Sequence, residues 1–313
     1  MTPASHIEIP EDQTLRIGTL NVNHAPESLA ERAQLLCDEL NTERPAVFCL
    51  QEVTFNGDGS SEQLREIARR TGLGIVANKH QKSLGNGQFS GVAILSSLKV
   101  RDSGHFNLRV EQSNNNTAVF AVLETLGGRT LIAITAHLHW GGNGERERLI
   151  QLTTIDHHVK LLLEQYGDDN TMVVLTGDFN AQPDGDALRF LTGKGAGSNN
   201  RYTFWTDCNE FAAPGSESAT VANNNHWAAE TAKIKDIVFP ALMPNRRIDY
   251  IMSYGWSYGK PGSPLKQRRA FDDDSIYGFT ASDHYGLITD FWNPALVPAE
   301  NVSAVSEIAE AVG

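Results

Sequence analysis

The chain has 313 residues, of which 40% are hydrophobic and 20% charged, and this balance excludes an intrinsically disordered protein. Its net charge of −12 disfavours nonspecific coating of nucleic acid, because an acidic surface repels long polyanions. Three widely spaced cysteines without a Cys-x-x-Cys pair favour buried free thiols over a thiolate zinc site. The first residues lack the apolar stretch of a signal peptide and no run could span a membrane, so we expect a cytoplasmic protein.

Hydrophobic periodicity predicts both strands and helices. Helices are expected at 28–41, 60–71 and 146–166, where apolar residues recur at helical spacing. Strands are expected at 15–22, 46–53, 91–96, 100–106, 117–124, 131–139, 172–175, 248–252 and 286–291. Hairpin-like runs of strands with a few helices favour an α+β fold over a doubly wound parallel sheet.

Neither an internal repeat nor a clear linker divides the chain, so we expect one domain over residues 14–293. A loose leader is expected at 1–13, and a C-terminal tail at 294–313 that forms a short helix or frays. The intervals 193–245 and 255–281 are expected to form loops at the rim of a substrate site, since loops on a rigid scaffold commonly set specificity.

Polar side chains follow several apolar strands at the point where each strand ends. The tetrapeptide Gly177-Asp178-Phe179-Asn180 comes after the strand at 172–175, and strand alternation puts Asp178 and Asn180 on one face. By itself this tetrapeptide is more often a turn, because its residue types are common in turns. Other strand ends carry similar residues, namely Asn21, Glu52, His137, Asp249, Asp283 and His284. Because buried carboxylates and imidazoles are costly unless paired or liganded, their convergence on one site explains the set best.

Three of these residues have the chemistry of a metal site. Glu52 and Asp283 offer the hard oxygen ligands that Mg²⁺ or Mn²⁺ prefers, and Asn21 offers a carboxamide oxygen or a contact to water.

The other residues have the chemistry of acid–base catalysis. Asp178 is a candidate to orient or deprotonate a water, and Asn180 to hydrogen-bond a phosphoryl oxygen. His137 and His284 can donate to developing negative charge, and Asp249 can orient an imidazole. Together with a metal ion, these groups suit hydrolysis of a phosphoester.

The ordered series of motifs resembles the endonuclease/exonuclease/phosphatase superfamily over about residues 15–292. The resemblance is carried by Asn21, Gln51-Glu52, Ser90–Ser96, His137, Gly177–Asn180, Arg247–Ile251 and Ser282–His284. It implies a four-layered α/β/β/α sandwich of two packed mixed sheets flanked by helices. It also implies that activity depends on a divalent metal, usually Mg²⁺, with Glu52 as the principal ligand and with contributions from Asn21 and Asp283.

The resemblance also implies catalytic roles for five residues. Asp178 would position or activate the attacking water, and Asn180 would hold the phosphate. Asp249 would pair with His284, which would stabilise the transition state, and His137 would contact the scissile phosphate. The identity of the general base stays open.

The segment Thr135–Trp140, followed by Arg148–Leu152, is similar to the deadenylase and 2′-phosphodiesterase branch, although Ala136 is an extra residue between Thr135 and His137. Phe89 stands where apurinic endonucleases carry a phosphate-binding Tyr, which argues against abasic-site repair.

We therefore expect a Mg²⁺- or Mn²⁺-dependent phosphodiesterase or nuclease that cleaves RNA, DNA or a nucleotide-like diester by in-line attack of water. One alternative is a phosphomonoesterase for a small nucleotide, inositol or sugar phosphate. A remote alternative is an inactive binding module of the same fold. The expected partner is a phosphoester, nucleic acid or nucleotide, and no protein partner can be inferred.

Two further groups of residues have open interpretations. Trp205, Trp227 and Tyr202 are expected either to stack on a base or, more often for such residues, to pack the insertion onto the domain. The basic residues in Arg246-Arg247 and in Lys266-Gln267-Arg268-Arg269 either form a local anion-binding patch or are simply solvated.

Overall fold

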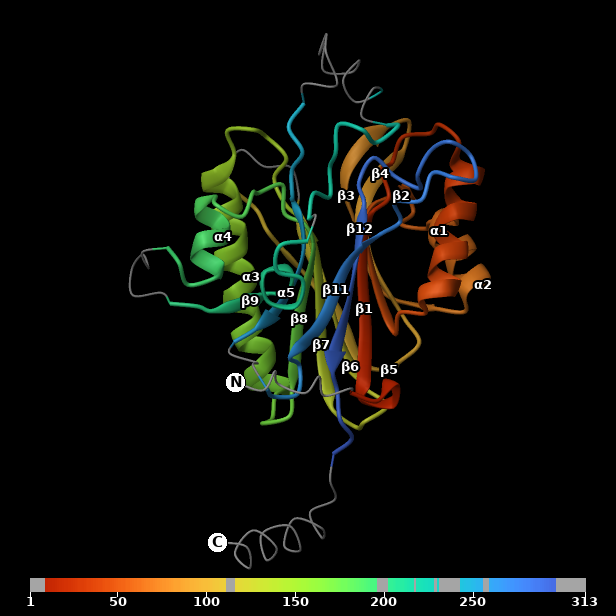
Figure 1. Ribbon diagram of the computed structural model, residues 1–313. Coiled ribbons are helices and arrows are strands. Elements are labelled where there is room, and N and C mark those ends of the chain that lie inside the picture. The colour runs from red at the N-terminus through yellow and green to blue at the C-terminus, as the bar shows by residue number, and fades with distance from the viewer. Residues whose placement is uncertain are drawn as a thin grey trace, which may run out of the picture.

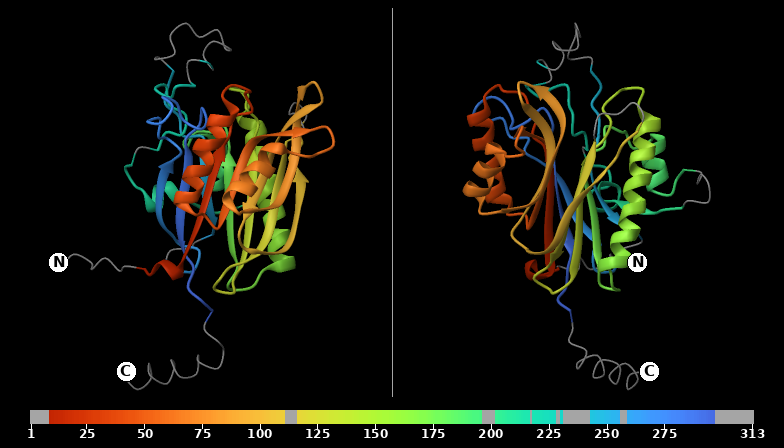
Figure 2. Two further views of the ribbon diagram at one scale, coloured as in Figure 1. Left: turned by 90° about the vertical axis from the view of Figure 1, so that its right-hand side faces the viewer. Right: turned by 180° about the vertical axis from the view of Figure 1, so that it is seen from behind.

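The computed structural model describes residues 9–110, 116–195, 202–216, 218–227, 230, 243–255 and 259–296. Within these ranges two six-stranded sheets pack face to face, and helices cover both outer faces (Figure 1, Figure 2). The expected four-layered α+β sandwich is therefore confirmed. None of the described helices is both long and apolar enough to cross a membrane.

The first sheet consists of β1 (Thr14–Asn21), β2 (Val47–Asn56), β3 (Gly74–Gly85), β4 (Gln88–Ser96), β11 (Pro264–Ala270) and β12 (Gly286–Trp292). Its strand order is β11-β12-β1-β2-β4-β3. The helices α1 (Leu29–Glu43) and α2 (Glu62–Thr71) lie on its outer face (Figure 1). Only β1 and β2 are parallel neighbours in the described part of this sheet, and both are central.

The second sheet consists of β5 (Lys99–Asn107), β6 (Thr117–Glu124), β7 (Thr130–His137), β8 (Met172–Asp178), β9 (Trp205–Asp207) and β10 (Asp249–Tyr254). Its order is β5-β6-β7-β8-β10-β9, and β7 and β8 form its parallel central pair. The helices α3 (Glu145–Tyr166) and α4 (Asp186–Leu191) lie on its outer face (Figure 1). A short helix, α5 (Cys208–Ala212), follows β9.

The apolar residues of the central strands alternate between two hydrophobic layers, because successive side chains of a strand point to opposite faces. In β2, Val47 and Cys49 pack between the sheets, whereas Phe48 and Leu50 pack toward α1 and α2. Strand β8 divides its residues in the same way between the inter-sheet layer and the layer under α3. Burial on both faces explains why these strands are continuous apolar runs in the sequence.

The long, regular elements agree with the sequence prediction, but several short or polar ones were missed. Strands β3, β9 and β11 and helices α4 and α5 were not expected. Strand β11 lies inside the interval 255–281, which was expected to consist of loops over the site. The interval 193–245 likewise contains β9 and α5.

The expectations for the chain ends are tested only in part. A 3-10 helix at Glu11–Gln13 occupies the end of the expected leader, and β1 begins at Thr14. Residues 1–8 and 297–313 lie outside the described ranges.

Candidate active site

The topology of the second sheet brings three of the predicted residues together. Strands β7 and β8 are parallel, and their register places His137 opposite Asp178 where both strands end. Strand β10 is antiparallel to β8, so its first residue, Asp249, lies opposite Asp178 as well. The ends of two strands and the beginning of a third thus meet at one edge of the sheet.

The first sheet contributes its residues to the same edge. Asn21 ends β1, and its Nδ2 donates hydrogen bonds to Glu52 Oε1 at 3.3 Å and, in the other sheet, to Asp178 Oδ2 at 3.0 Å. Asp283 and His284 lie just before β12, separated from it by Tyr285, and β12 is antiparallel to β1. Both sheets therefore supply polar side chains to one location.

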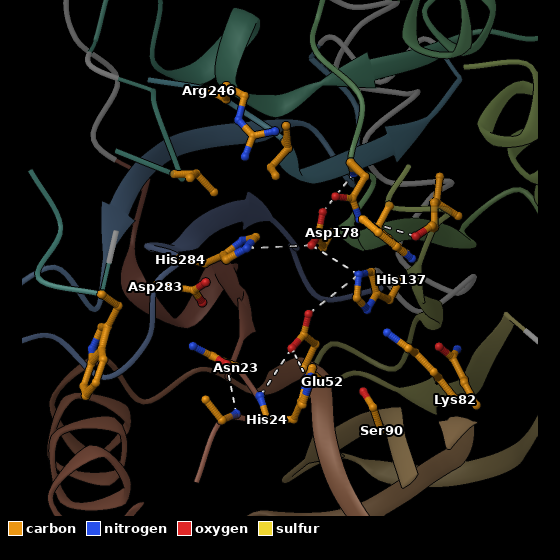
Figure 3. A pocket seen from close by; sticks show the side chains of 18 of the residues that line it. Asn23, His24, Glu52, Lys82, Ser90, His137, Asp178, Arg246, Asp283 and His284 are labelled. Carbon is orange, nitrogen blue, oxygen red and sulfur yellow. Dashed lines mark hydrogen bonds and ion pairs between the residues drawn. The ribbon is translucent and has the colours of Figure 1, made fainter. Parts of the chain in front are cut away.

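A cavity of about 520 Å³ opens at this location (Figure 3). Six of the eight predicted site residues line it, namely Glu52, His137, Asp178, Asn180, Asp283 and His284. The other two, Asn21 and Asp249, are fully buried behind the wall and hydrogen-bond to residues that line it.

Asp178 lies at the centre of the cluster and is 2% exposed. Its Oδ1 accepts a hydrogen bond from the backbone N–H of Asn180 at 2.8 Å. Its Oδ2 lies 3.4 Å from His137 Nε2 and 3.9 Å from His284 Nε2 (Figure 3). Oδ1 is thus held by a backbone N–H, and Oδ2, which also accepts from Asn21 Nδ2, faces two imidazoles.

Glu52 occupies an irregular position in β2. The register between β2 and β4 shifts between Gln51 and Val53, so Glu52 is the extra residue of a β-bulge, with a left-handed φ of +59°. The buried side chain of Gln51 below it donates to Thr19 Oγ1 at 3.0 Å and to Thr135 Oγ1 in the other sheet at 2.9 Å. Because of the bulge, Glu52 can direct its carboxylate into the cavity although the preceding residue, Gln51, points between the two sheets.

His24, in the loop after β1, is a partner of Glu52 that sequence reasoning missed. Its Nδ1 makes a short hydrogen bond to Glu52 Oε2. Burial alone would raise the pKa of Glu52, but the hydrogen bond from His24 and the charge of His137 outweigh burial and lower it. The same hydrogen bond raises the pKa of His24. Glu52 is therefore an anion that is balanced by imidazoles.

His284 and Asp249 form a buried pair, as expected, with His284 Nδ1 2.8 Å from Asp249 Oδ2. Burial opposes the charged imidazolium, but the Asp249 carboxylate outweighs burial and raises the pKa of His284. Because Asp249 holds Nδ1, the other nitrogen, Nε2, is directed toward Asp178 and the cavity (Figure 3).

The orientation of Asn21 differs from the one expected. Its Oδ1 accepts a hydrogen bond from the backbone N–H of Asn23 at 3.0 Å, so its Nδ2 is the atom that faces the carboxylates. In this structure Asn21 therefore links Glu52 and Asp178 as a donor and does not present an oxygen to a metal.

The donor set of the cavity fits a hard divalent cation, because Glu52 and Asp283 both offer carboxylate oxygens to one space. Among the described residues, a different group also has the spacing of metal ligands: atoms of Asp178, Asp249 and His284 lie within 4.8 Å of one another. Asp249 and one nitrogen of His284 are already bonded to each other, so this group suits a hydrogen-bond relay better than a metal site.

In the segment Gly177–Asn180, where β8 ends, two residues have a positive φ. Gly177 has a φ of +134°, and a Cβ there would lie 2.0 Å from the carbonyl oxygen of Ala136 in β7. Asn180 has a left-handed φ of +51°, which Asn tolerates better than most residues, and its Nδ2 donates to Leu138 O at 3.4 Å.

Two residues of α3 that belong to the deadenylase-like motif, Arg148 and Gln151, hold the loop after β7 through hydrogen bonds. Arg148 in α3 donates to the carbonyl oxygens of His139 at 3.1 Å and Gly141 at 2.7 Å. Gln151 accepts from the His139 N–H at 2.9 Å. These bonds hold the loop that carries Trp140, which is 61% exposed and lines the cavity.

The three aromatic residues considered for base stacking, Trp205, Trp227 and Tyr202, differ in burial and in distance from the cavity. Trp205 is buried and donates from Nε1 to Asp156 Oδ1 at 3.1 Å, so it packs the structure. Trp227 is also buried but borders the cavity, whereas Tyr202 is exposed and does not line it. Trp140, which was not considered for stacking, is the exposed aromatic residue at the cavity.

The basic residues of the two segments also differ in their surroundings. Arg247 is buried in an ion pair with Asp207 at 2.7 Å, but its neighbour Arg246 faces the cavity (Figure 3). In β11, Arg268 pairs with Glu43, and Arg269 pairs with Asp272 at 2.8 Å. Arg268 and Arg269 thus stabilise the structure, whereas Arg246 faces the cavity.

The chain belongs to the endonuclease/exonuclease/phosphatase family, because the model of that family matches residues 18–284. No curated protein sequence matches the chain. The fold is similar to D. rerio TDP2 complexed with a single strand DNA product, with 22% identity, a TM-score of 0.61, and coverage of 89% of this chain and 98% of that one. It is also similar to the human Nocturnin catalytic domain with bound sulfate, with 18% identity, a TM-score of 0.63 and coverage of 89% and 94%.

A third similar structure is an endonuclease/exonuclease/phosphatase family protein from Leptotrichia buccalis, with 18% identity, a TM-score of 0.62 and coverage of 88% and 98%. The likeness to all three extends over nearly the whole chain and establishes the fold.

Proposed function

We propose that the chain is a divalent-metal-dependent phosphodiesterase of the nuclease type that cleaves RNA, DNA or a nucleotide-like diester. The observation that carries this proposal is the position of Asp178. It is a buried carboxylate with one oxygen fixed by the Asn180 N–H and the other facing His137 and His284 in an open cavity. Family membership and the oxygen donors of the cavity support the same reaction class.

The residues of the cavity divide the work of in-line hydrolysis. Asp178 Oδ2 orients a water and accepts its proton as the oxygen attacks phosphorus. Asn180 holds a nonbridging oxygen of the phosphate through the second hydrogen of Nδ2. His284 donates from Nε2 to the charge that develops on the phosphoryl oxygens, and Asp249 keeps it in the donating form. His137 contacts the same phosphate from the other side of Asp178 (Figure 3).

A divalent cation, Mg²⁺ or Mn²⁺, would be held by Glu52 with a contribution from Asp283, since both carboxylates line the cavity. When bound, it would neutralise charge on the phosphate and stabilise the leaving oxygen. Asn21 holds the Glu52 and Asp178 carboxylates in position in this arrangement.

A nucleic-acid or nucleotide substrate is favoured by the walls of the cavity. Trp140 offers an exposed ring on which a base can stack, and Lys82 lies 5.8 Å from the centroid of that ring. The D. rerio TDP2 structure that shares this fold holds a single strand DNA product.

Hydrolysis of bis-p-nitrophenyl phosphate, with Mg²⁺ or Mn²⁺ and with EDTA, tests the proposal. We expect turnover that requires the metal, and we expect Glu52→Gln to reduce it at least about 100-fold, because the substitution removes the anionic ligand. Glu62→Gln is the matched control, since the side chain of Glu62 is 79% exposed on α2.

Retained turnover in Glu52→Gln would exclude this residue as the principal ligand. Faster hydrolysis of p-nitrophenyl phosphate than of the diester would favour the phosphomonoesterase alternative. A wild-type protein without metal-dependent turnover on any phosphoester would instead be a binding module.

A further inference from the structure

Arg246 lines the cavity, and its guanidinium makes no hydrogen bond or ion pair with any residue that the structure describes. The side chain is half-buried, and its backbone is fixed by a hydrogen bond from its N–H to Val221 O at 2.8 Å. Its neighbour Arg247, by contrast, is neutralised by Asp207. A half-buried cation without a counter-ion loses hydration without compensation, and an anion entering the cavity would supply that compensation.

The position of Arg246 separates this anion from the phosphate that is attacked. Arg246 lies on the side of Asp178 and His284 that is opposite to Glu52 and Lys82 (Figure 3). It forms no ion pair with the carboxylates of Asp178 or Asp283, although all three residues line the same cavity. An anion held by the guanidinium therefore lies to one side of the catalytic cluster.

Two cations of the cavity therefore lie on different sides of Asp178. Lys82, whose Nζ lies over the Trp140 ring, is on one side, and Arg246 is on the other (Figure 3). A small monoester or diester fills the middle only, whereas a nucleotide chain carries further phosphates beyond the scissile one. A guanidinium matches the nonbridging oxygens of such a phosphate with two parallel hydrogen bonds.

We propose that Arg246 binds a second, uncleaved phosphate of the substrate, so that the site selects nucleotide chains with at least two phosphates. This inference rests on the proposed function, because the phosphate that is cleaved lies in the same cavity. The second phosphate is either 5′ or 3′ to the scissile one, and the two positions share the same chemistry.

Equilibrium binding tests the inference without turnover. The probes are thymidine 3′,5′-bisphosphate, thymidine 5′-phosphate and thymidine 3′-phosphate, titrated calorimetrically in the presence of Mg²⁺. We expect the wild-type protein to bind the bisphosphate about 10- to 100-fold more tightly than either monophosphate, as is typical of a charge-assisted contact. The Arg246→Gln protein should lose this preference for the bisphosphate. Its affinity for whichever monophosphate the wild-type protein binds more tightly should stay the same.

Two further variants make the test specific. Arg246→Lys keeps the charge but not the paired donors, so it should retain part of the preference. Arg69→Gln removes a cation whose side chain is 71% exposed on α2, and it should bind all three probes as the wild type does.

Three results would overturn the inference: no preference in the wild-type protein, no effect of Arg246→Gln, or an equal loss for all three probes. The last would place Arg246 on the scissile phosphate itself. Turnover of the dinucleotide TpT, measured in parallel, judges the proposed function separately. A protein that prefers the bisphosphate but does not cleave any phosphoester would keep this subsite and lose the proposed activity.

Discussion

Asp178 Oδ2 lies between two histidines that come from different sheets. His137 ends β7 in the second sheet, and His284 precedes β12 in the first. The position of this oxygen therefore depends on how the two sheets are packed. In the proposed reaction it is the atom that directs water at phosphorus, with an imidazole on either side to receive negative charge.

Asp178→Asn tests this role. The new carboxamide can still accept the hydrogen bond from the Asn180 N–H, but it loses the charge and the basic oxygen that water requires. We expect kcat to fall by about 10²–10⁴, the range for removal of a general base. Steady-state kinetics measure the fall in kcat, and titration with Mn²⁺ measures the metal affinity, which should change little. A fall in kcat of less than about tenfold would assign the water to another group.

Most of the candidate site could be predicted from sequence because its residues stand at the ends of apolar strands. Glu52, His137 and Asp178 are polar interruptions of hydrophobic runs, which a sequence displays directly. His24 could not be found in this way, since it lies in a loop and meets Glu52 only through the fold. The orientation of Asn21 could not be predicted either, because a loop N–H determines which of its atoms faces the carboxylates.

At the scale of elements, the parallel pair β7–β8 is the support of the site. The two strands approach so closely at Ala136 and Gly177 that a side chain at position 177 has no space. Asp178 follows directly, so any widening of this pair moves the carboxylate away from the histidines.

Gly177→Ala should therefore affect both stability and activity. We expect a loss of about 3 kcal/mol or more in the free energy of unfolding, from a strained φ and a clash with backbone that cannot rotate away. Thermal denaturation and turnover measure the two effects. Gly59→Ala is the control, because Gly59 also has a positive φ, +82°, but open space around it, so it should cost only about 1 kcal/mol.

A Gly177→Ala protein as stable as the control would show that β7 and β8 can separate without cost at this point.

The elements that sequence reasoning missed either lie at the edge of a sheet or are short. Strand β3 lies at one edge of its sheet and β11 at the other, where strands are half-exposed and carry charges that prevent pairing with another molecule. Such strands lack the continuous apolar runs of β2 and β8. Helices α4 and α5 are too short to show a helical period.

At the scale of the whole molecule, Glu39 joins a helical layer to the edge of the first sheet. It lies in α1, and its carboxylate accepts a hydrogen bond from the backbone N–H of Phe271, directly after β11, at 2.5 Å. Burial raises the pKa of Glu39 to about 7, although this hydrogen bond opposes the shift.

This shift makes the stability of the fold depend on pH. The pKa of Glu39 is higher in the folded protein than its ordinary 4.5, so the folded state binds more protons between pH 4.5 and about 7. The contribution of Glu39 to the free energy of unfolding therefore falls as the pH rises through this window. Above about pH 7 the folded protein bears the full cost of keeping this buried carboxylate ionised.

Glu39→Gln keeps an acceptor for the Phe271 N–H and removes the charge. We expect it to raise the free energy of unfolding by about 1 kcal/mol at pH 8, after allowance for solvent screening, and to have little effect at pH 5. Thermal melts of both proteins across this range measure the difference. A stabilisation that is the same at pH 5 and pH 8 would contradict the assignment, and Glu62→Gln should show no pH-dependent difference.

The strand order also determines when the site can exist during synthesis. Strand β1 is the neighbour of β12, the last strand described, and His284 lies two residues before β12 begins. Because a chain leaves the ribosome from its N-terminus, Asn21, Glu52, His137 and Asp178 emerge long before their last partner. A nascent chain that ends before residue 284 therefore lacks a complete site. If the proposed activity is correct, the order of the strands would delay that activity until the segment with Asp283 and His284 has been translated.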